Sequence, residues 1–513
     1  QSLGLEGHAQ LAIAGIKAGG RKEIGVRQAG FLSARDKFYS LSRRFNALAG
    51  RSSILRSSNF KDEPAALWPY LWEAGMTGIH QAWGEQDADP DKYVELVQAA
   101  GEFDLMWIDV LPYDGNTFGA RQPYKRHRMT SVVEKPGADV VLAKYQYLPA
   151  FHGFWSEENY PDANWYITAP EFEAWLKNKY GADFRRKLGI AADYDLMSKR
   201  GDDCLEDPGP LKTEFLQACA DLLLGQWRES QEWLGGLRKG CAFTFSVHGR
   251  VSIKFPGVAA KVGSVIAANG PEQYQCFGRF NSFYMEMHKG GEARPVMCEF
   301  YNWYSPSPAH DIRGFAQHLM HGECFYNFTA NQIFGQATSS YAMWSWEQSR
   351  WENLKKILFK ARKIREYLEV PASAANVGLV ASELSYMAFY PVKMFEADNV
   401  LPNRWYQQQA ALWTALNQSQ IPTDIIWAEA LTPEKLKRYR ALVLLDARIV
   451  TPPQAEIIRD WVKAGGVLIA GGSTSLCNQW AEFQEDYQMA DLFGVSYGGF
   501  AGVTDPEKID TFC

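Results

Sequence analysis

Two short apolar runs, each ending in glutamate, carry the residues of this sequence best suited to chemistry. Glu157 and Glu158 lie in the aromatic run of residues 154–160, and Glu299 lies in the run of residues 296–303. Each run predicts a buried parallel strand with its carboxylate at the carboxyl end. Hydrolysis of a glycosidic bond requires one carboxyl group to protonate the leaving oxygen and another to stabilise or attack the sugar carbon. The pattern therefore predicts a sugar-cleaving carboxylate pair, provided that both strands belong to one barrel.

Within this pair, we expect Glu299 to be the nucleophile and Glu157 to be the acid/base. Glu158 remains the alternative acid/base, because repulsion between adjacent carboxylates raises the proton affinity of one of them. We prefer Glu157 because it continues the expected strand soon after Trp155. The alternative for each glutamate is a solvated surface position, but both lie on apolar runs among aromatic residues.

Other aromatic and polar residues, most of them at or just past expected strand ends, are candidate substrate contacts. They are Trp83, Trp107, Asp109, Trp155, Asn159, His248, Tyr301, Asn302, Trp303 and Trp346. Aromatic residues make up 14% of the chain, and their clustering near carboxylates favours a sugar-binding cleft. For a single Trp, core packing is the alternative, and for His248 a core or surface position is equally open.

The elements that must position these residues alternate along the first part of the chain. Eight strands are expected, separated by amphipathic helices such as residues 91–100 and 171–179. The expected strands are residues 24–27, 77–82, 105–110, 153–157, 241–247, 262–267, 295–300 and 324–328. This order predicts a (β/α)8 TIM barrel over residues 1–370, with a long excursion after the fourth strand that forms an active-site wall.

A second α/β pattern follows a linker near residue 371. Short apolar strands alternate with single helices over residues 371–495, which predicts a smaller, flavodoxin-like doubly wound domain. We expect a structural or assembly role for it, because Cys477 lacks the glycine-flanked turn of a nucleophile. Residues 496–513 have no evident core, and we expect a tail or the start of a further C-terminal module.

Charge, hydropathy and cysteine usage limit the binding partners, metals and cellular locations that we expect. The formal net charge of −6 offers no basic field for nucleic acid, and no apolar run approaches the roughly 20 residues that cross a bilayer. Eight scattered cysteines lack metal-ligand spacing, so we expect no metal and no disulfide framework. Free thiols favour the cytoplasm, whereas the start at Gln1 leaves periplasmic or secreted location open through a removed leader.

The chain resembles the retaining glycosidases with (β/α)8 barrels, and among them the family 42 β-galactosidases and their relatives. The segments that carry the resemblance are residues 138–158, 174–181, 299–303, 311–328 and 441–472. The resemblance implies a retaining, exo-acting β-glycosidase that uses no cofactor and acts on an oligosaccharide or β-glycoside. It also implies a homotrimer, held together by an amidotransferase-like second domain without amidotransferase chemistry.

The sequence departs from the family pattern at two places. Ser156 precedes Glu157, where the family has Asn, and residues 329–350 do not match the family's substrate loop. These departures leave two alternatives open. One is β-mannosidase activity or another β-glycosidase specificity on the same scaffold, and the other is a non-catalytic carbohydrate-binding or scaffold protein.

Overall fold

The chain folds as two compact units in the computed structural model, and each unit contains separated stretches of sequence. The first unit comprises residues 1–168, 218–374 and 392–414, and the second comprises residues 169–217, 375–391 and 415–513. The structure describes residues 38–43, 90–103, 105–110, 151–159, 169–196, 211–218, 242–247, 266–268, 296–300, 325–329, 348–364, 373–389 and 404–499, with short pieces between 72 and 81, at 148, between 220 and 225, between 282 and 292, and at 313 and 316.

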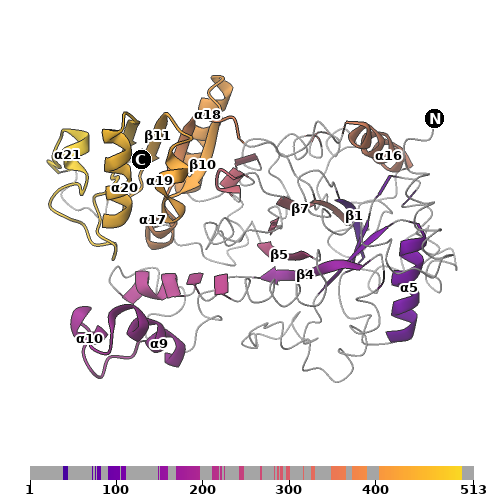
Figure 1. Ribbon diagram of the computed structural model, residues 1–513, viewed down its shortest axis with the longest axis horizontal. Helices are drawn as coiled ribbons and strands as arrows, with labels where there is room; N and C mark the ends of the chain where they lie inside the picture. Colours follow the sequence, from indigo (N-terminus) through magenta and orange to yellow (C-terminus); the bar gives the residue numbers. More distant parts are fainter. Residues whose placement is uncertain are drawn as a thin grey trace. The chain divides into compact units, whose positions relative to one another are not determined.

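Eight parallel strands of the first unit form a closed barrel in sequence order, part of which can be followed in Figure 1. The strands are β1 (Phe38–Arg43), β2 (Gly78–Gln81), β3 (Met106–Val110), β4 (Phe151–Asn159), β5 (Ala242–Val247), β6 (Ile266–Ala268), β7 (Val296–Phe300) and β8 (Phe325–Thr329). The barrel closes where β1 pairs with β8, with Tyr39 opposite Tyr326. Two described helices of this unit are α5 (Pro90–Glu102) and α16 (Gln348–Lys363). The predicted parallel barrel is thus confirmed.

The first barrel strand is not the one that the sequence predicted. The prediction placed it at residues 24–27, whereas β1 comprises Phe38–Arg43 and pairs with both β2 and β8. The run Phe-Tyr-Ser-Leu-Ser alternates apolar and small polar residues, which suits a strand, but its serines conceal it among the polar residues around it. The sixth strand is also later and shorter than the predicted 262–267, because β6 comprises only Ile266–Ala268.

The second unit contains a four-stranded parallel sheet in the order β10-β9-β11-β12. Its strands are β9 (Val377–Ala381), β10 (Thr423–Trp427), β11 (Ala441–Leu445) and β12 (Val467–Gly471). The helical elements between and after them are α17 (Glu383–Phe389), α18 (Arg404–Gln418), the 3-10 turn η6 (Ala428–Ala430), α19 (Pro433–Leu436), α20 (Pro452–Lys463) and α21 (Ala490–Phe493). Helix α17 was not predicted, and α18 belongs to the first unit up to Thr414.

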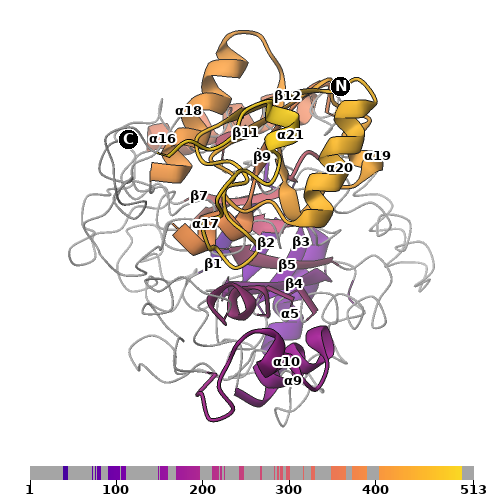
Figure 2. The same ribbon diagram turned by 90° about the vertical axis from the view of Figure 1, so that its left-hand side faces the viewer.

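One hydrophobic cluster of the second unit forms on one face of this sheet, and strand residues of the opposite face such as Leu379 and Ile425 are also fully buried. In this cluster, apolar side chains of the strands pack with Leu436 of α19 and with Ala455 and Ile458 of α20, and Figure 2 shows these two helices on the same side of the strands. Helix α20 begins after Thr451, whose backbone N–H donates to Gln454 Oε1 at 2.8 Å. Gly466 follows the helix, and a Cβ there would lie 2.4 Å from ring carbons of Trp461, so only glycine fits under that indole.

The excursion after β4 folds with the second unit, which departs from the linear domain division that the sequence suggested. It contains α9 (Ala169–Tyr180), α10 (Phe184–Lys187) and helical residues 211–217, and the first unit resumes at Ala218. Phe172 of α9 and Phe215 are both buried, and their rings meet edge to face at 5.2 Å. The second unit is therefore assembled from a barrel excursion as well as from the C-terminal part of the chain.

Candidate active site at the carboxyl ends of the barrel strands

Glu299 lies in strand β7, one residue before the strand ends at Phe300. Its backbone is in register with Asn327 of β8, and Cys298 before it is in register with Ala268 of β6. A carboxylate at this position of a barrel strand belongs to the end where barrel enzymes place their catalytic residues. Asn327 is a polar neighbour that the sequence interpretation did not select. Its strand position beside Glu299 was the only available signal.

Glu157 and Glu158 lie in β4 at an irregularity of the strand pairing. Ser156 is in register with Phe245 of β5 and Asn159 with Val247, so β4 advances three residues while β5 advances two. This one-residue mismatch describes a β-bulge, a feature that re-aims side chains beside active sites. In a regular strand, neighbouring residues alternate between the two faces. The bulge falls on the doublet itself, so alternation along the strand does not assign the acid/base to one of the two glutamates.

The parallel barrel brings the two candidate strand ends to the same rim. All eight strands run in one direction, so their carboxyl ends share one end of the barrel. Strands β4 and β7 are separated by β5 and β6 in the barrel, so the doublet and Glu299 come from non-adjacent strands of that rim. Asp109, one residue before the end of β3, is in register with Phe154 of the neighbouring β4. This arrangement is suited to two carboxylates acting from different sides of one sugar.

The other candidate substrate contacts divide into three groups. Trp155 lies in β4 within the predicted fourth strand of residues 153–157, and Asn159 also lies in β4, which continues two residues past that prediction. Trp107 lies in β3 with no exposed surface, which favours core packing over contact with a sugar. The remaining candidates lie outside the described residues; they are Trp83, His248, Tyr301, Asn302, Trp303 and Trp346.

Acidic residues also lie near strand ends of the second unit, but their carboxylates accept hydrogen bonds from backbone N–H groups of that unit. Glu429, which follows β10, accepts hydrogen bonds from the backbone N–H groups of Glu383 and Leu384, both at 3.1 Å. Asp446, which follows β11, accepts from the backbone N–H of Ser473 at 3.1 Å and from Arg448 Nε at 3.2 Å. These contacts give both carboxylates a structural role.

Cys477 lies near the same strand ends and is fully buried. Burial raises the pKa of its thiol to about 12, while the nearby Arg448 opposes the shift and Asp446 adds to it. A thiol in this state is protonated at neutral pH and is a poor nucleophile. The expectation that Cys477 is not catalytic is consistent with these surroundings.

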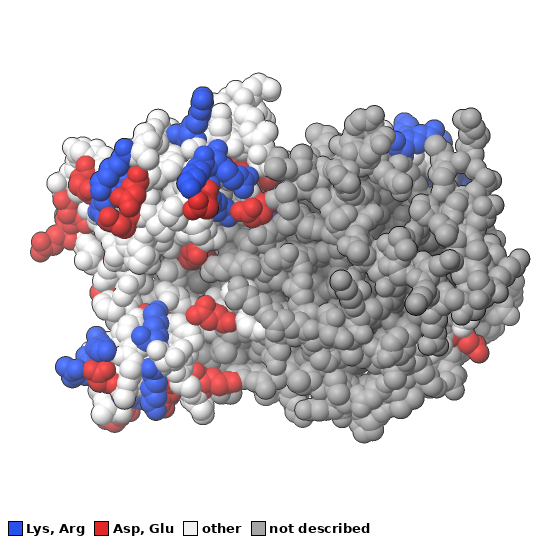
Figure 3. Space-filling view, viewed as in Figure 1, with Lys and Arg blue, Asp and Glu red and all other residues white. Residues whose placement is uncertain are grey.

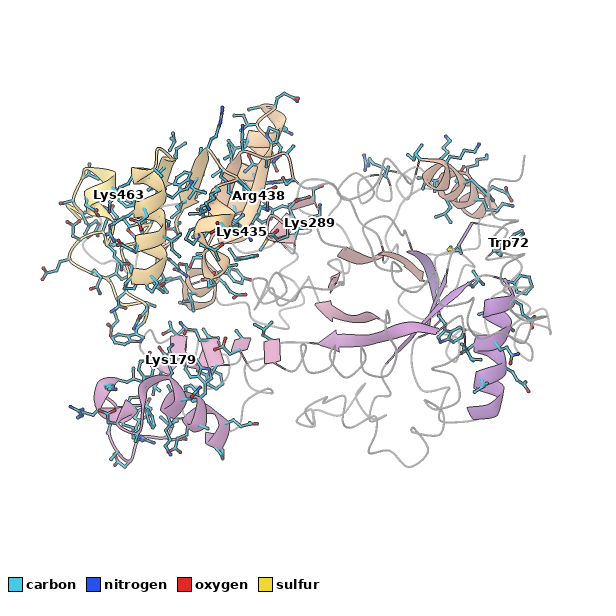
Figure 4. All side chains as sticks on the ribbon, in the orientation of Figure 1. Trp72, Lys179, Lys289, Lys435, Arg438 and Lys463 are labelled. Atoms are coloured by element: carbon cyan, nitrogen blue, oxygen red, sulfur yellow. The ribbon has the colours of Figure 1, made fainter. Side chains whose placement is uncertain are left out.

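Glu214 is a buried carboxylate at the centre of a polar cluster that the sequence interpretation did not find. We call Lys179, Tyr180, Glu214 and Trp480 the Glu214 cluster; Lys179 extends from α9 and is labelled in Figure 4. Burial, reinforced by the hydrogen bond to Glu214, raises the pKa of Tyr180 above its ordinary value, so its hydroxyl stays protonated and donates. The available signal was weak: Glu214 is followed by the apolar residues Phe215 and Leu216 in the helical segment 211–218.

Charged side chains of the second unit are of mixed sign. On the face drawn in Figure 3, Lys and Arg are interspersed with Asp and Glu. Pairs include Lys437 with Glu434, Lys463 with Asp460 and Arg459 with Asp491. Within the described ranges, no three His, Cys, Asp or Glu side chains gather as metal ligands would. The helices described here include none with the length and apolarity to cross a membrane.

The architecture defines a class of protein in which a closed parallel barrel precedes a parallel α/β unit. Within this class, the chain has the fold of the family 42 β-galactosidases. No protein-family model and no curated protein sequence matches it.

Three of the similar solved structures illustrate the likeness. The β-galactosidase from Bacillus circulans sp. alkalophilus is 14% identical, with a TM-score of 0.66 over 88% of this chain and 74% of that chain. The enzyme from the psychrophilic Marinomonas ef1 is 14% identical, with a TM-score of 0.63 over 89% and 79%. The GH42 β-galactosidase from G. stearothermophilus, a catalytic mutant, is 12% identical, with a TM-score of 0.64 over 88% and 74%.

Proposed function

We propose that this protein is a retaining, exo-acting β-glycosidase that removes terminal β-linked sugars, with β-galactosides as the first substrates to test. The observation that carries the proposal is the placement of Glu299 and the Glu157-Glu158 doublet at one end of a closed eight-stranded barrel. The fold shared with β-galactosidases supports the choice of sugar. The proposal requires no cofactor or metal, because both proton transfer and nucleophilic attack are performed by carboxyl groups.

The proposed reaction has two displacements. In the first, Glu299 attacks the anomeric carbon while Glu157 protonates the leaving oxygen, which yields a covalent glycosyl-enzyme and the free aglycone. In the second, Glu157 removes a proton from water as that water attacks the same carbon and releases Glu299. The sugar leaves with its original anomeric configuration. Glu158 takes the role of Glu157 if the bulge in β4 turns it toward the sugar.

The second unit has a proposed role in assembly. Its strand order, β10-β9-β11-β12, corresponds to a 2-1-3-4 order along the chain and supports a flavodoxin-like domain. We propose that this domain mediates assembly into a homotrimer. Sedimentation equilibrium tests this assignment, because a monomer at micromolar concentration would contradict it.

A mechanism-based label tests the catalytic assignment directly. A 2-fluoro β-galactoside with a good leaving group should inactivate the protein and leave a sugar on the peptide that contains Glu299. A panel of aryl β-galactosides, β-mannosides and β-glucosides, followed by proton NMR of the first-formed sugar, gives the specificity and the stereochemical course. Release of the inverted anomer would contradict the retaining mechanism. Binding of sugars without turnover of any panel member would support the alternative of a non-catalytic carbohydrate-binding protein.

A further inference from the structure

The register of the barrel strands assigns their residues to the two faces of the sheet. Residues in register on neighbouring parallel strands lie on the same face, and successive residues of one strand alternate between the faces. Glu299 of β7 is in register with Asn327 of β8, and Asn327 is in register with Ser40 of β1. The candidate nucleophile therefore belongs to a row of polar residues on one face of three neighbouring strands.

This assignment is consistent around the whole barrel. In one direction, the register leads from Glu299 through β6 and β5 to Trp155 of β4. In the other direction, it leads through β8, β1, β2 and β3 to the same residue. Both paths place Trp155 on the face of Glu299, so the two faces are defined for all eight strands.

The face of Glu299 is the interior of the barrel. The opposite face carries mainly large apolar residues, which suits a surface that helices cover, with Asp109 and Ser156 as polar exceptions. Trp107 lies on that opposite face without exposed surface, and its strand β3 packs against helix α5. Small and polar residues are frequent on the face of Glu299; examples are Ser40, Ser42, His80, Thr244, Ser246 and Thr329.

An asparagine in register with a nucleophilic carboxylate has a chemical use. Neighbouring strands are about 4.8 Å apart, and an asparagine amide offers two N–H donors. Hydrogen bonds to the ionised form of a carboxyl group favour that form. A glutamate must be ionised to attack an anomeric carbon, so a donor beside Glu299 would favour its reactive state.

We propose that Asn327 is a positioning residue for Glu299, because its amide donates a hydrogen bond that holds the nucleophilic carboxylate ionised and in place. The role rests on the proposed glycosidase function. It concerns only the neighbouring strands β7 and β8, whose register brings the two residues together.

Other titratable residues of the barrel strands are less directly placed to act on Glu299. His80 of β2 shares its face but lies three strands away around the barrel. His152 and the glutamate doublet lie at irregularities of β4, where the pairing assigns no face. Among the described strand residues, Asn327 is the side-chain donor that the register brings directly beside the nucleophile.

The pH dependence of kcat/KM tests this role on one ionisation at a time. The acid limb reports the group that must be ionised in the free enzyme, and the alkaline limb reports the group that must be protonated. Asn327→Ala removes the donor and should move the acid limb upward by about one pH unit. On that limb, kcat/KM for 4-nitrophenyl β-galactoside falls about tenfold. The alkaline limb, which reports the acid/base on β4, should stay in place.

Asn327→Asp is a second variant of nearly the same shape, and it serves where Asn327→Ala folds poorly. It places another carboxylate in register with Glu299, so like-charge repulsion should move the acid limb further than the alanine does. Tyr326→Phe is the matched control. It removes a polar group from the neighbouring position of β8, which lies on the opposite face, and should leave both limbs unchanged.

Carbodiimide labelling provides a readout that does not depend on activity. Carbodiimides react with protonated carboxyl groups, so the pH midpoint for labelling of Glu299, mapped by mass spectrometry, follows its ionisation. The midpoint should rise from the wild type to Asn327→Ala and again to Asn327→Asp.

Unchanged midpoints in both variants, equal movement of both limbs, or the same shift in Tyr326→Phe would overturn the role of Asn327 while leaving the glycosidase proposal intact. A wild-type protein that cleaves no aryl glycoside would overturn the proposed function. The labelling midpoints would still decide whether Asn327 acts on Glu299.

Discussion

The barrel of the first unit and the sheet of the second unit both carry acidic residues near the carboxyl ends of their strands. The two sets differ in position, because one lies before the strand end and the other lies after it. Glu299 and the doublet lie inside β7 and β4, before each strand ends. Glu429 and Asp446 lie just after β10 and β11, where the chain turns. A side chain inside a strand has its neighbouring backbone groups paired in the sheet, whereas one in a turn lies beside backbone N–H groups that need acceptors.

The difference shows how similar parallel sheets can support different roles. In the second unit, Glu429 satisfies two N–H groups at the start of α17, and Asp446 satisfies the N–H of Ser473. A carboxylate that is occupied in this way stabilises the fold and is poorly suited to attack a substrate. We therefore expect the position of an acid relative to the strand end to distinguish the carboxylates proposed to be catalytic from those that cap backbone N–H groups.

The largest expected effect is the loss of activity in Glu299→Gln. The amide keeps the shape of the side chain but cannot form the glycosyl-enzyme, so kcat/KM for an aryl β-galactoside should fall by about 10⁴-fold or more. Steady-state kinetics measures the loss, and the melting temperature should match that of the wild type.

Glu429→Gln is the control for this variant in the other sheet. It makes the same change at a capping carboxylate and should retain wild-type kcat/KM. If Glu299→Gln retained activity, or if both variants lost it equally, the contrast between the two sheets would be wrong.

The reactivity of Cys477 gives the next largest effect. With a pKa raised by burial to about 12, its thiolate is scarce at pH 8. Iodoacetamide should label it about 10³-fold more slowly than an unhindered thiol, because the thiolate is the reacting form. Mass-spectrometric mapping of the peptide that contains Cys477 measures the rate in native protein and in urea. Fast labelling of the native protein would indicate an accessible nucleophile in the second unit.

Much of the fold could be predicted from the sequence because buried parallel strands are continuous apolar runs. The runs before Glu299 and in residues 441–445 have this pattern, and both form the expected strands. β1 was missed because its serines interrupt the apolar pattern. The domain assignment of residues 169–217 depends on contacts with Ala388 and Trp480, which are far away in sequence and leave no local signal.

The candidate site was less predictable than the fold for a similar reason. Strand periodicity indicates which end of the barrel Glu157 and Glu299 occupy. It does not reveal the bulge at the doublet, because a bulge depends on the register with β5, a strand that lies far along the chain. Periodicity also does not tell whether a Trp such as Trp107, which has no exposed surface, is packed in the core or available to a cleft.

A moderate effect on stability is expected from Glu429→Ala. Removal of this carboxylate leaves the N–H groups of Glu383 and Leu384 without their acceptor, which should lower the free energy of unfolding of the second unit by about 1–3 kcal/mol. Urea unfolding followed by hydrogen exchange in β9 and α17 measures the change. Glu429→Gln keeps one acceptor oxygen and should lose less. An unchanged unfolding midpoint in Glu429→Ala would show that the carboxylate does not stabilise the start of α17.

The smallest expected effect concerns the exposed pair between Arg459 of α20 and Asp491 of α21. Their hydrogen bond, 3.0 Å from Arg459 Nε, holds the pKa of Asp491 below its ordinary value of 3.8. A lowered pKa means that the folded state favours the charged form, so the stabilisation is present at neutral pH and is lost as the pH falls below about 4. Because Asp491 is largely exposed, solvent screening limits the contribution to about 0.5 kcal/mol. Thermal unfolding of the wild type and Asp491→Asn should differ slightly at pH 7 and converge near pH 2 to 3, whereas a difference that persists in acid would mean that Asp491 stabilises α21 by some route other than its charge.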